Sequence, residues 1–560
     1  MKNLAFRPVL LSDLKHYNKE TLLADLFAGV TVGVVALPLA MAFAIACGLP
    51  PDVGITTAII GGFLAAVFGG SRRQVSGPTG AFVVIIVSII AQHGIPGLMI
   101  ATLMAGVILI LLGAFRLGAL IKFVPFPVVT GFTSGIAVVI FSTQLKDIFG
   151  LPGALPVAFH EKLIYLVQHI SEANPWPIAL CVFTTAIIFL CRRYYPKLPA
   201  MLIGMLSGTA IAVIFKLNAE TIGMRFGELP SSLPLPSLPA FEFGMLPDLL
   251  APAVTIALLA AIESLLSATV ADSMTGDRHN SDTELIGQGI GNIGAVIFGG
   301  IPVTGAIART ATNIRSGGRT PVAGIVHALT LAMILLLFGS QATMIPLAIL
   351  SGVMVVVCYN MSEYHAFLRM FRGPKSDWGV MVITFLVTVF SDLIVAVMIG
   401  MLLSVLLFIR RMAEAADVKV VGGDDTQPDP DATSEKDIPP GVLVFEVQGA
   451  FFFGAVNRFQ SLVWSTVKSS PPRVVVLRLR HVPIIDATGL NVLLDFAQLC
   501  QKHHFPLVLS GVQPQPYREL GKYGVTAIVG KHNVCRHIDE ALVRVKQIIE
   551  EQEVEKVTEI

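Results

Sequence analysis

The sequence predicts an α-helical polytopic membrane protein whose membrane part is followed by a small α/β domain. Of its 560 residues, 54% are hydrophobic and only 14% are charged, a balance unlike that of soluble globular domains. Residues 76–115 and 321–362 contain no Asp, Glu, Lys or Arg, and each stretch is long enough for two helical spans of about 20 residues. Charged residues instead concentrate after residue 412, which indicates a separate soluble domain there.

Changes in composition divide the chain into four segments. They are predicted to be a cytoplasmic N-terminal segment (1–22), a membrane domain (23–412), a linker (413–440) and a cytoplasmic α/β domain (441–560). The net charge of +1 gives no sign of nucleic-acid binding, and the six cysteines have no metal-ligand spacing. Because charged residues are spread over the first twenty positions, the first apolar stretch is predicted to remain in the membrane rather than to be a cleaved signal.

Apolar stretches interrupted by charges, Pro and Gly predict about fourteen membrane spans, two of them short. If the N-terminus is cytoplasmic, the loops on that side hold most of the Arg and Lys, including Arg72, Arg73, Arg410 and Arg411. This bias predicts a multi-pass protein of the cell inner (plasma) membrane with both termini in the cytoplasm. The predicted spans are residues 24–47, 53–70, 79–92, 96–115, 123–142, 174–191, 198–215, 249–271, 284–300, 306–315, 321–338, 343–360, 378–392 and 393–410.

Two pairs of similar segments indicate an internal repeat. Phe-Gly-Gly ends predicted spans at residues 68–70 and 298–300, which are 230 positions apart. The segments 124–131 and 345–352 form a second pair at an offset of 221. Because an odd number of spans separates the copies, they would have opposite orientations in the membrane. The sequence therefore predicts seven plus seven spans arranged as inverted repeats.

The first short span is one half of the candidate substrate site. In inverted-repeat transporters, broken helices direct free N–H groups and the positive ends of their dipoles at the substrate. Ser76, Thr79 and Gly80 lie at the start of this span. The two hydroxyls can donate hydrogen bonds to an anion, and the glycine allows close approach.

The second short span is predicted to supply the other half of the site. Gly305, Ala306 and Arg309 lie at its start, and Arg309 adds a fixed positive charge. Two converging helix starts and a guanidinium are typical of an oxyanion site. The alternative is that Gly and Pro only break helices at packed crossings, while Arg309 extends toward the membrane surface.

Glu263 is the candidate for proton coupling. It is the only ionisable residue between Leu249 and Ala271. A charged residue at mid-span costs about 2.5–3.5 kcal/mol on insertion scales, and an apolar environment favours the neutral carboxyl form. Ser267 lies one helical turn further on and is predicted to line the same cavity. The alternative is that Glu263 is a structural partner of Arg309 or of a backbone amide.

The end of the chain is predicted to be a regulatory α/β domain. Residues 424–440 are acidic and Pro-rich, as in a linker. No nucleotide fingerprint, catalytic triad or metal cluster is recognisable in the remainder, so binding or regulation is favoured over catalysis. The pattern predicts strands at 442–447, 474–479 and 506–510 and helices at 490–502 and 537–551.

Four motifs resemble those of the sulfate permease (SulP) family of anion transporters, and the resemblance covers nearly the whole chain. The motifs are at residues 76–79, 263–273, 280–292 and 314–320. The resemblance implies a fold of seven plus seven inverted spans like that of uracil permease, in which a core domain moves against a gate domain. It also implies a homodimer and a C-terminal STAS domain.

The resemblance also assigns roles to particular residues. The family's anion site falls on Thr79 and on Gly305, Ala306 and Arg309. Sodium-coupled bicarbonate members carry Asp where this chain has Glu263 and lack the arginine, so the chain resembles the proton-coupled members. In the STAS loop at residues 485–489, Ala487 replaces the serine that related domains phosphorylate, which argues against a phosphorylation switch there.

These observations together predict a transporter rather than an enzyme, without a cofactor or metal. The expected activity is proton-coupled symport of sulfate or a related small anion, such as bicarbonate or a C4-dicarboxylate, by elevator-like alternating access. The expected partners are a second copy of the chain and a cytoplasmic protein that binds the STAS domain. The alternatives are a passive anion exchanger or channel, a nucleobase carrier, and a membrane-anchored regulator.

Overall fold

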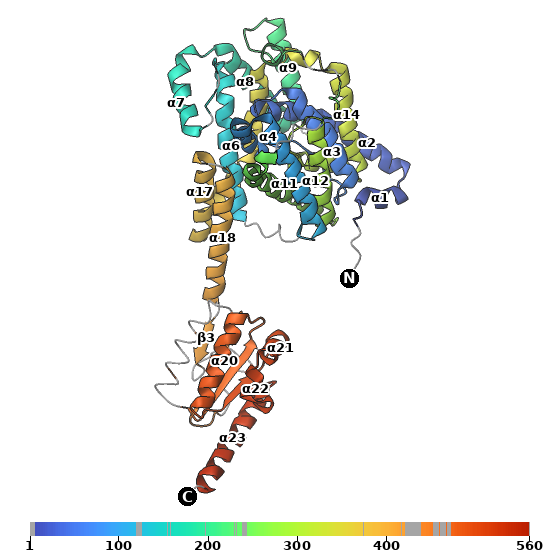
Figure 1. The fold of residues 1–560 in the computed structure, drawn as a ribbon. Coiled ribbons are helices and arrows are strands. Elements are labelled where there is room, and N and C mark those ends of the chain that lie inside the picture. Colours follow the sequence, from blue (N-terminus) through green and yellow to red (C-terminus); the bar gives the residue numbers. More distant parts are fainter. Residues whose placement is uncertain are drawn as a thin grey trace. The chain divides into compact units, whose positions relative to one another are not determined.

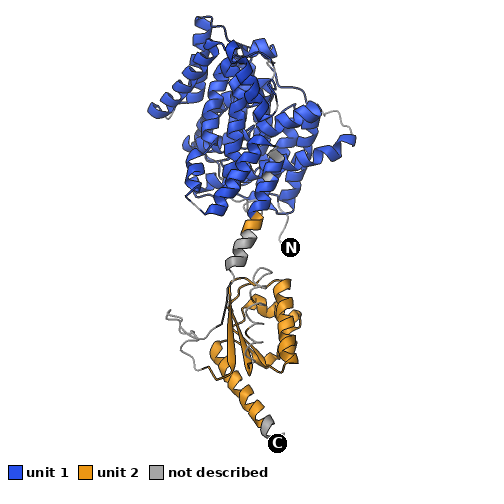
Figure 2. Cartoon of the chain, turned by 90° about the vertical axis from the view of Figure 1, so that its left-hand side faces the viewer, with its two compact units in different colours: residues 1–404 blue, residues 405–560 orange. Residues whose placement is uncertain are grey.

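The computed structural model has two compact units, residues 1–404 and residues 405–560 (Figure 2). Each unit has its own arrangement of secondary structure and is considered by itself. The structure describes residues 6–118, 126–153, 155–156, 158–195, 198–228, 230, 232–237, 243–372, 374–391, 393–415, 417–420, 438–451, 459, 466 and 472–558.

The first unit consists mainly of packed helices (Figure 1). Seven of its described helical segments are long and apolar enough to cross a membrane, and three shorter ones are also apolar. Its main elements are α1 (Val9–Asp13), α2 (Lys19–Ala46), α3 (Pro51–Phe68), β1 (Ser76–Gly77), α4 (Ala81–Ala114), α6 (Phe126–Phe149), α7 (Phe159–His169), α8 (Pro175–Tyr194), α9 (Ala200–Ile214), α10 (Ile222–Phe226), α11 (Leu246–Thr275), α12 (Ser281–Ile297), β2 (Thr304–Gly305), α13 (Ile307–Arg315), α14 (Val322–Phe338), α15 (Leu347–Met361), α16 (Tyr364–Met370), α17 (Lys375–Phe390) and α18 (Leu393–Ala415).

Each predicted span falls on one of these helices, so the prediction of a helical membrane protein is confirmed. α4 carries two predicted spans, 79–92 and 96–115, and its course breaks between them. Gly94 there has a φ of 68°, a conformation that glycine adopts readily, and Pro96 follows it. α7 lies outside the predicted spans because its charged and polar residues interrupt the apolar pattern.

Local signals in the sequence shape the turn between α11 and α12. α11 ends at Thr275 and is followed by Gly276, which has a φ of 78° in the left-handed region that glycine tolerates. α12 begins after Asn280, whose side chain accepts hydrogen bonds from the backbone N–H groups of Asp282 and Thr283. The chain therefore reverses over a few residues, and α11 and α12 lie against each other.

Small residues allow α12 to pack closely against α3 and α4. A Cβ atom at Gly287 would lie 2.7 Å from the Cα atom of Gly69, just after α3. A Cβ atom at Gly289 would lie 2.5 Å from the carbonyl oxygen of Gly106 in α4. Backbones in membrane bundles approach this closely only where side chains are absent or small. α12 is therefore held against α3 and α4, the two helices on either side of β1.

The two breaks predicted by the repeat meet in a short antiparallel ribbon. β1 pairs with β2, with Ser76 opposite Gly305 and Gly77 opposite Thr304. Each strand directly precedes a helix, α4 after β1 and α13 after β2. Segments more than 220 positions apart in the sequence therefore form one structural feature.

The second unit is a five-stranded sheet flanked by helices (Figure 1). The sheet order is β3-β4-β5-β6-β7, in which the β3–β4 pair is antiparallel and the other pairs are parallel. Its main elements are β3 (Asp417–Val420), β4 (Val442–Gln448), β5 (Val474–His481), α20 (Ala487–Lys502), β6 (Leu507–Ser510), α21 (Pro514–Lys522), α22 (Val525–Val529), β7 (Val534–Cys535) and α23 (Ile538–Thr558).

Alternate residues of the strands face opposite sides of this sheet. Phe445 and Leu477 pack with apolar residues of α20, whereas Val444 and Val476 pack with apolar residues of α23. Both faces are buried, which explains why β5 reads as a nearly continuous run of apolar residues. The five predicted elements of this domain are confirmed as β4, β5, β6, α20 and α23.

The predicted linker, residues 413–440, is wrong at residues 417–420. These residues form β3, which pairs with β4 along the edge of the sheet. These four residues alternate between charged and apolar, and so short a segment resembles a linker in the sequence. They form a strand because they pair with β4, which lies further along the chain. The acidic stretch 421–437 lies outside the described residues.

Close packing of α3 against α2 gives a test of the fold. A Cβ atom at Gly54 would lie 2.0 Å from the carbonyl oxygen of Ala40, whereas nothing lies within 4 Å of a Cβ atom at Gly379 in α17. Gly54→Ala is expected to destabilise the protein by about 1–3 kcal/mol through overpacking. Gly379→Ala, a helix substitution in open space, is expected to keep or raise stability. Thermal unfolding of the purified variants checks this, and equal midpoints for Gly54→Ala and wild type would contradict the packing.

Candidate functional site

The β1–β2 ribbon places two helix starts close together. Gly80 is the N-cap of α4 and Ala306 is the N-cap of α13. The first N–H groups of a helix lack partners within the helix, and the dipole places about half a positive charge at that end. Chemically, two such ends in one place suit an anion.

Arg309 lies in the first turn of α13 and is only 2% exposed. Its Nη2 group donates a hydrogen bond of 2.9 Å to the carbonyl oxygen of Pro78. Nη1 is buried and has no hydrogen-bond partner in the described part of the chain. This group lies against β1, because a Cβ atom at Gly77 would be 2.0 Å from it. A buried guanidinium with an unused donor is costly unless an anion completes it.

Glu263, on α11, lies beside the start of α4. Its Oε2 atom accepts a hydrogen bond of 2.9 Å from the hydroxyl of Thr79. Among the described residues it forms no ion pair with Arg309, so the alternative interpretation as a structural partner of that arginine has no support. Two residues that the sequence predicted separately, Thr79 for the anion and Glu263 for the proton, are therefore in direct contact.

Two other predicted ligands have partners within the protein. The Ser76 hydroxyl is 4% exposed and accepts a 2.7 Å hydrogen bond from Gln288 Nε2. The backbone N–H of Gly305 donates to the hydroxyl of Ser264 at 3.0 Å. These groups hold the ribbon to α12 and α11.

The remaining predicted residues, Ala306 and Ser267, also make internal contacts. The N–H of Ala306 donates to the carbonyl oxygen of Val75 at 3.0 Å. Ser267 is fully buried and donates to the hydroxyl of Thr310 at 3.1 Å, so it joins α11 to α13 rather than contacting the Glu263 carboxylate. The Ser267 side chain therefore has a structural partner, and its predicted role in proton coupling stays a prediction.

Glu284, at the start of α12, supports the site, although its role is not evident from the sequence. Its carboxylate accepts hydrogen bonds from the N–H groups of Gly70 and Ser71 at 2.8 and 3.0 Å. It also accepts from the side-chain amides of Gln74 and Gln288 at 2.7 and 2.8 Å. The segment that leads into β1 is thereby fastened to α12. A carboxylate near the start of an apolar span was the only signal of this role.

Asn292 fastens the segment before β2 to α12, as Glu284 fastens the segment before β1. Its side chain donates to the carbonyl oxygen of Val303 and accepts from the N–H of Val303, at 2.8 and 2.9 Å. This pair of bonds satisfies the backbone just before β2. One helix, α12, therefore positions both strands of the ribbon.

Side chains from two other helices cover the start of α4. A Cβ atom at Gly80 would lie 2.7 Å from the sulfur of Met361, at the end of α15, and 3.2 Å from the ring of Phe43 in α2. A larger residue at position 80 would therefore have to displace the side chain of Met361. The site is therefore enclosed by residues from both halves of the chain.

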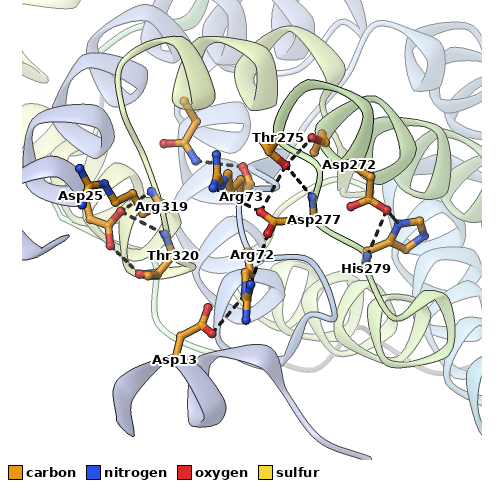
Figure 3. A network of polar contacts seen from close by, with 12 residues as sticks. Asp13, Asp25, Arg72, Arg73, Asp272, Thr275, Asp277, His279, Arg319 and Thr320 are labelled. Atoms are coloured by element: carbon orange, nitrogen blue, oxygen red, sulfur yellow. Dashed lines mark hydrogen bonds and ion pairs between the residues drawn. The ribbon is translucent and has the colours of Figure 1, made fainter. Parts of the chain in front are cut away.

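A network of charged residues holds the loop between α3 and β1 (Figure 3). Arg72 forms ion pairs with Asp13 and Asp277 at 3.2 and 3.3 Å, and Arg73 pairs with Asp277 at 3.3 Å. Burial raises the pKa of Asp13, and the positive charge of Arg72 opposes this effect. The network links α1, this loop and the segment after α11.

Asp25, near the start of α2, anchors the segment before α14 in the same region (Figure 3). It is fully buried and accepts from the N–H groups of Arg319 and Thr320 at 2.7 and 3.1 Å. Tyr17 donates to it at 3.1 Å, and burial together with this carboxylate raises the pKa of Tyr17 to about 12. The tyrosine therefore remains a neutral donor at physiological pH.

Comparisons with known proteins identify the family. Residues 22–384 match the model of the sulfate permease family. The chain belongs to the sulfate permease family. Residues 433–541 match the STAS domain, so the second unit of this family member is a STAS domain. The family membership confirms an anion transporter that crosses the membrane several times, and not an enzyme.

Two curated members of the family are similar over most of the chain. "Putative sulfate transporter YvdB" of Bacillus subtilis (strain 168) is 40% identical over 528 residues, which are 94% of this chain and 98% of that protein. Bicarbonate transporter BicA of Picosynechococcus sp. is 34% identical over 451 residues, covering 77% of this chain and 79% of that protein.

Solved structures of two family members confirm the fold. The transmembrane domain of a cyanobacterial bicarbonate transporter BicA has a TM-score of 0.62 at 33% identity, covering 69% of this chain and 98% of that one. The structure of SLC26A9 has a TM-score of 0.84 and covers 98% of this chain and 93% of that one. At 20% identity, the latter supports the fold alone.

The STAS loop of this family member starts α20. The Asp486 side chain caps the helix by accepting from the N–H of Gly489 at 2.8 Å. Ala487, the first residue of the helix, is exposed and has no hydroxyl. The loop keeps the shape of a capped helix start without a serine at the first position.

The contact between Gly77 and Arg309 gives a test of the site. Gly77→Ala would place a Cβ atom 2.0 Å from Nη1 and displace the guanidinium. Anion uptake is expected to fall about tenfold or more, because a hydrogen bond to a charged group contributes about 1.5–3 kcal/mol. Uptake into proteoliposomes measures the effect, with Gly379→Ala as the control for adding a methyl group to a glycine in open space. Normal uptake by correctly folded Gly77→Ala would show that the anion does not depend on this position of Arg309.

Proposed function

We propose that this protein is a secondary active transporter that carries sulfate or a related small anion together with protons by elevator-like alternating access. The anion would bind between the starts of α4 and α13, beside Arg309. Glu263 would carry the proton. Candidate substrates other than sulfate are bicarbonate and C4-dicarboxylates.

The hydrogen bond between Thr79 and Glu263 is the observation that best supports this proposal. Thr79 is a candidate anion ligand, and its hydroxyl donates to the Glu263 carboxylate at 2.9 Å. A hydroxyl has one proton to donate. If Glu263 becomes protonated, it no longer requires that donor, and the Thr79 hydroxyl can turn to the anion. Protonation and anion binding would thus favour each other, as symport requires.

Charge at the site supports a divalent substrate for the protonated state. Two helix ends contribute about half a charge each and Arg309 contributes one, which gives about +2. An ionised Glu263 would reduce this to about +1. The two negative charges of sulfate or succinate match the charge of the site when Glu263 is protonated. The single negative charge of bicarbonate matches it when Glu263 is ionised. Relatives named for sulfate and for bicarbonate transport fit these two cases.

The arrangement of the helices is compatible with elevator-like movement. The site-bearing elements α3, α4, α11, α12 and α13 pack on one another through close glycine contacts and the ribbon. A compact body of this kind could carry the anion as a unit past the other helices, among them α6, α15 and α17. We further propose a homodimer in the plasma membrane with both termini in the cytoplasm, where the STAS domain would bind a protein partner.

Glu263→Gln tests the coupling role, because glutamine keeps the size of the side chain and cannot ionise. Proteoliposomes with an inward proton gradient are given labelled sulfate, succinate or bicarbonate. Wild type is expected to accumulate one of these anions, while Glu263→Gln is expected to exchange it without accumulation. Equal uptake by both proteins, independent of pH, would contradict symport and favour a passive exchanger or channel.

Thr79 allows a matched pair of substitutions. Thr79→Ser keeps the hydroxyl and is expected to retain the wild-type pH profile of transport. Thr79→Val has a similar shape but cannot donate to Glu263, so its pH profile is expected to shift and its KM for the anion to rise. A shared profile for all three proteins would separate anion binding from the titration of Glu263.

A further inference from the structure

Lys162 is a second buried cation, in addition to Arg309, and it lies far in the sequence from the residues of the candidate site. It lies in the amphipathic helix α7 and is 4% exposed. In the described part of the chain its ammonium group has neither a hydrogen bond nor an ion pair. Burial lowers the pKa of Lys162. A buried lysine is normally paired, so the absence of a partner points to a ligand.

Lys162 lines a cavity of about 400 Å³ between α4, α6, α7 and α17. The helices that enclose it pack on one another, and α7 lies beside α6 (Figure 1). The other charged residue in the lining is Glu161, which is exposed and makes no ion pair with Lys162 among the described residues. Among the described residues, the one cation that lines the cavity therefore forms no ion pair.

The cavity follows the same face of α4 that begins at the candidate anion site. Val84, Ser88 and Gln92 line it and lie four, eight and twelve positions after Gly80. Residues at this spacing share one side of a helix. The cavity thus starts one turn from the helix start that would bind the anion, and continues to the end of the first arm of α4 near Gly94.

Polar groups that line this cavity along α4 can take part in anion binding. The Ser88 hydroxyl accepts a 3.1 Å hydrogen bond from the Gln92 side chain, so its own proton is available for another acceptor. Val83, Val84 and Val87 separate these groups from the candidate site. A cavity for lipid chains would need no such donor and no ammonium group.

We propose that Lys162 and Ser88 form an outer binding site at which the transported anion pauses between the solvent and the start of α4. The proposal rests on the proposed function, because it assumes that the anion reaches the start of α4 along this route. The ligand is the same small oxyanion that the transporter carries. On the orientation predicted from the positive charges, this site faces the side of the membrane opposite to the termini.

Lys162→Gln tests the proposal in intact cells, where the added anion reaches the protein from outside. We expect the KM for external anion to rise about tenfold with an unchanged Vmax, the loss typical of a charge-assisted hydrogen bond. Lys162→Arg is expected to restore most of the affinity. Lys146→Gln is the control, since Lys146 lies in α6 outside the cavity and donates to the carbonyl oxygen of Gly153.

Chemical restoration of the charge keeps the test valid if Lys162→Gln folds poorly. Lys162→Cys can be treated with aminoethyl methanethiosulfonate, which attaches an ammonium group, or with the sulfonate reagent, which attaches a negative charge. The first treatment is expected to return KM toward wild type and the second to raise it. A Lys162→Cys protein whose KM is normal and insensitive to both reagents overturns the proposal, as does a change in Vmax alone.

Measuring anion exchange without a proton gradient separates this proposal from the proposed function. If transport proves not to be coupled to protons, anion exchange can still be measured. The effect of Lys162→Gln on the KM for the anion can then be determined from that exchange. If Lys162→Gln lowers transport only in vesicles that contain anionic lipid, and does not change KM, then the cavity holds lipid and the outer anion site is wrong.

Discussion

A helix that breaks inside a membrane exposes backbone groups that hydrocarbon cannot satisfy. This transporter contains two such breaks, and they satisfy each other by pairing as β1 and β2. Backbone groups just before each strand are bound by α12, through Glu284 before β1 and Asn292 before β2. The positions of both helix starts therefore depend on one helix, and the glycines of α12 place that helix close enough to reach them.

The polar groups in the membrane unit differ in whether the protein completes their interactions. Glu284 receives four hydrogen bonds and Asp25 is bound by backbone N–H groups, so both are structural. Among the described residues, Arg309 retains one donor without a partner, and Lys162 lines the cavity without an ion pair. Burying an uncompensated charge is unfavourable. These two cations form no ion pair among the described residues, which is the pattern expected where an anion binds.

Much of the fold could be predicted from the sequence because the membrane acts locally on it. Apolar length and breaks at Gly and Pro reveal each span without knowledge of its neighbours. The sequence also pointed to Thr79, Glu263 and Arg309, since polar groups in apolar spans are conspicuous. Glu284 was not recognised as a support because its partners lie more than 200 positions earlier in the chain. β3 was missed for a similar reason, because only pairing with β4 makes it a strand.

The ribbon also shows how two similar repeats produce an asymmetric site. Each strand has a glycine that makes room for a long polar side chain: Gly77 lies against Arg309, and a Cβ atom at Gly305 would be 2.1 Å from Gln74. Gln74 belongs to the first repeat and its side-chain N–H donates to Glu284. Arg309 belongs to the second repeat and keeps one donor without a partner among the described residues. On the proposed function, the first of these side chains fastens the ribbon to α12 and the second would bind the anion. On this proposal, the two repeats supply a pair of helix starts held by one ribbon, and their different side chains separate the structural role from the binding role.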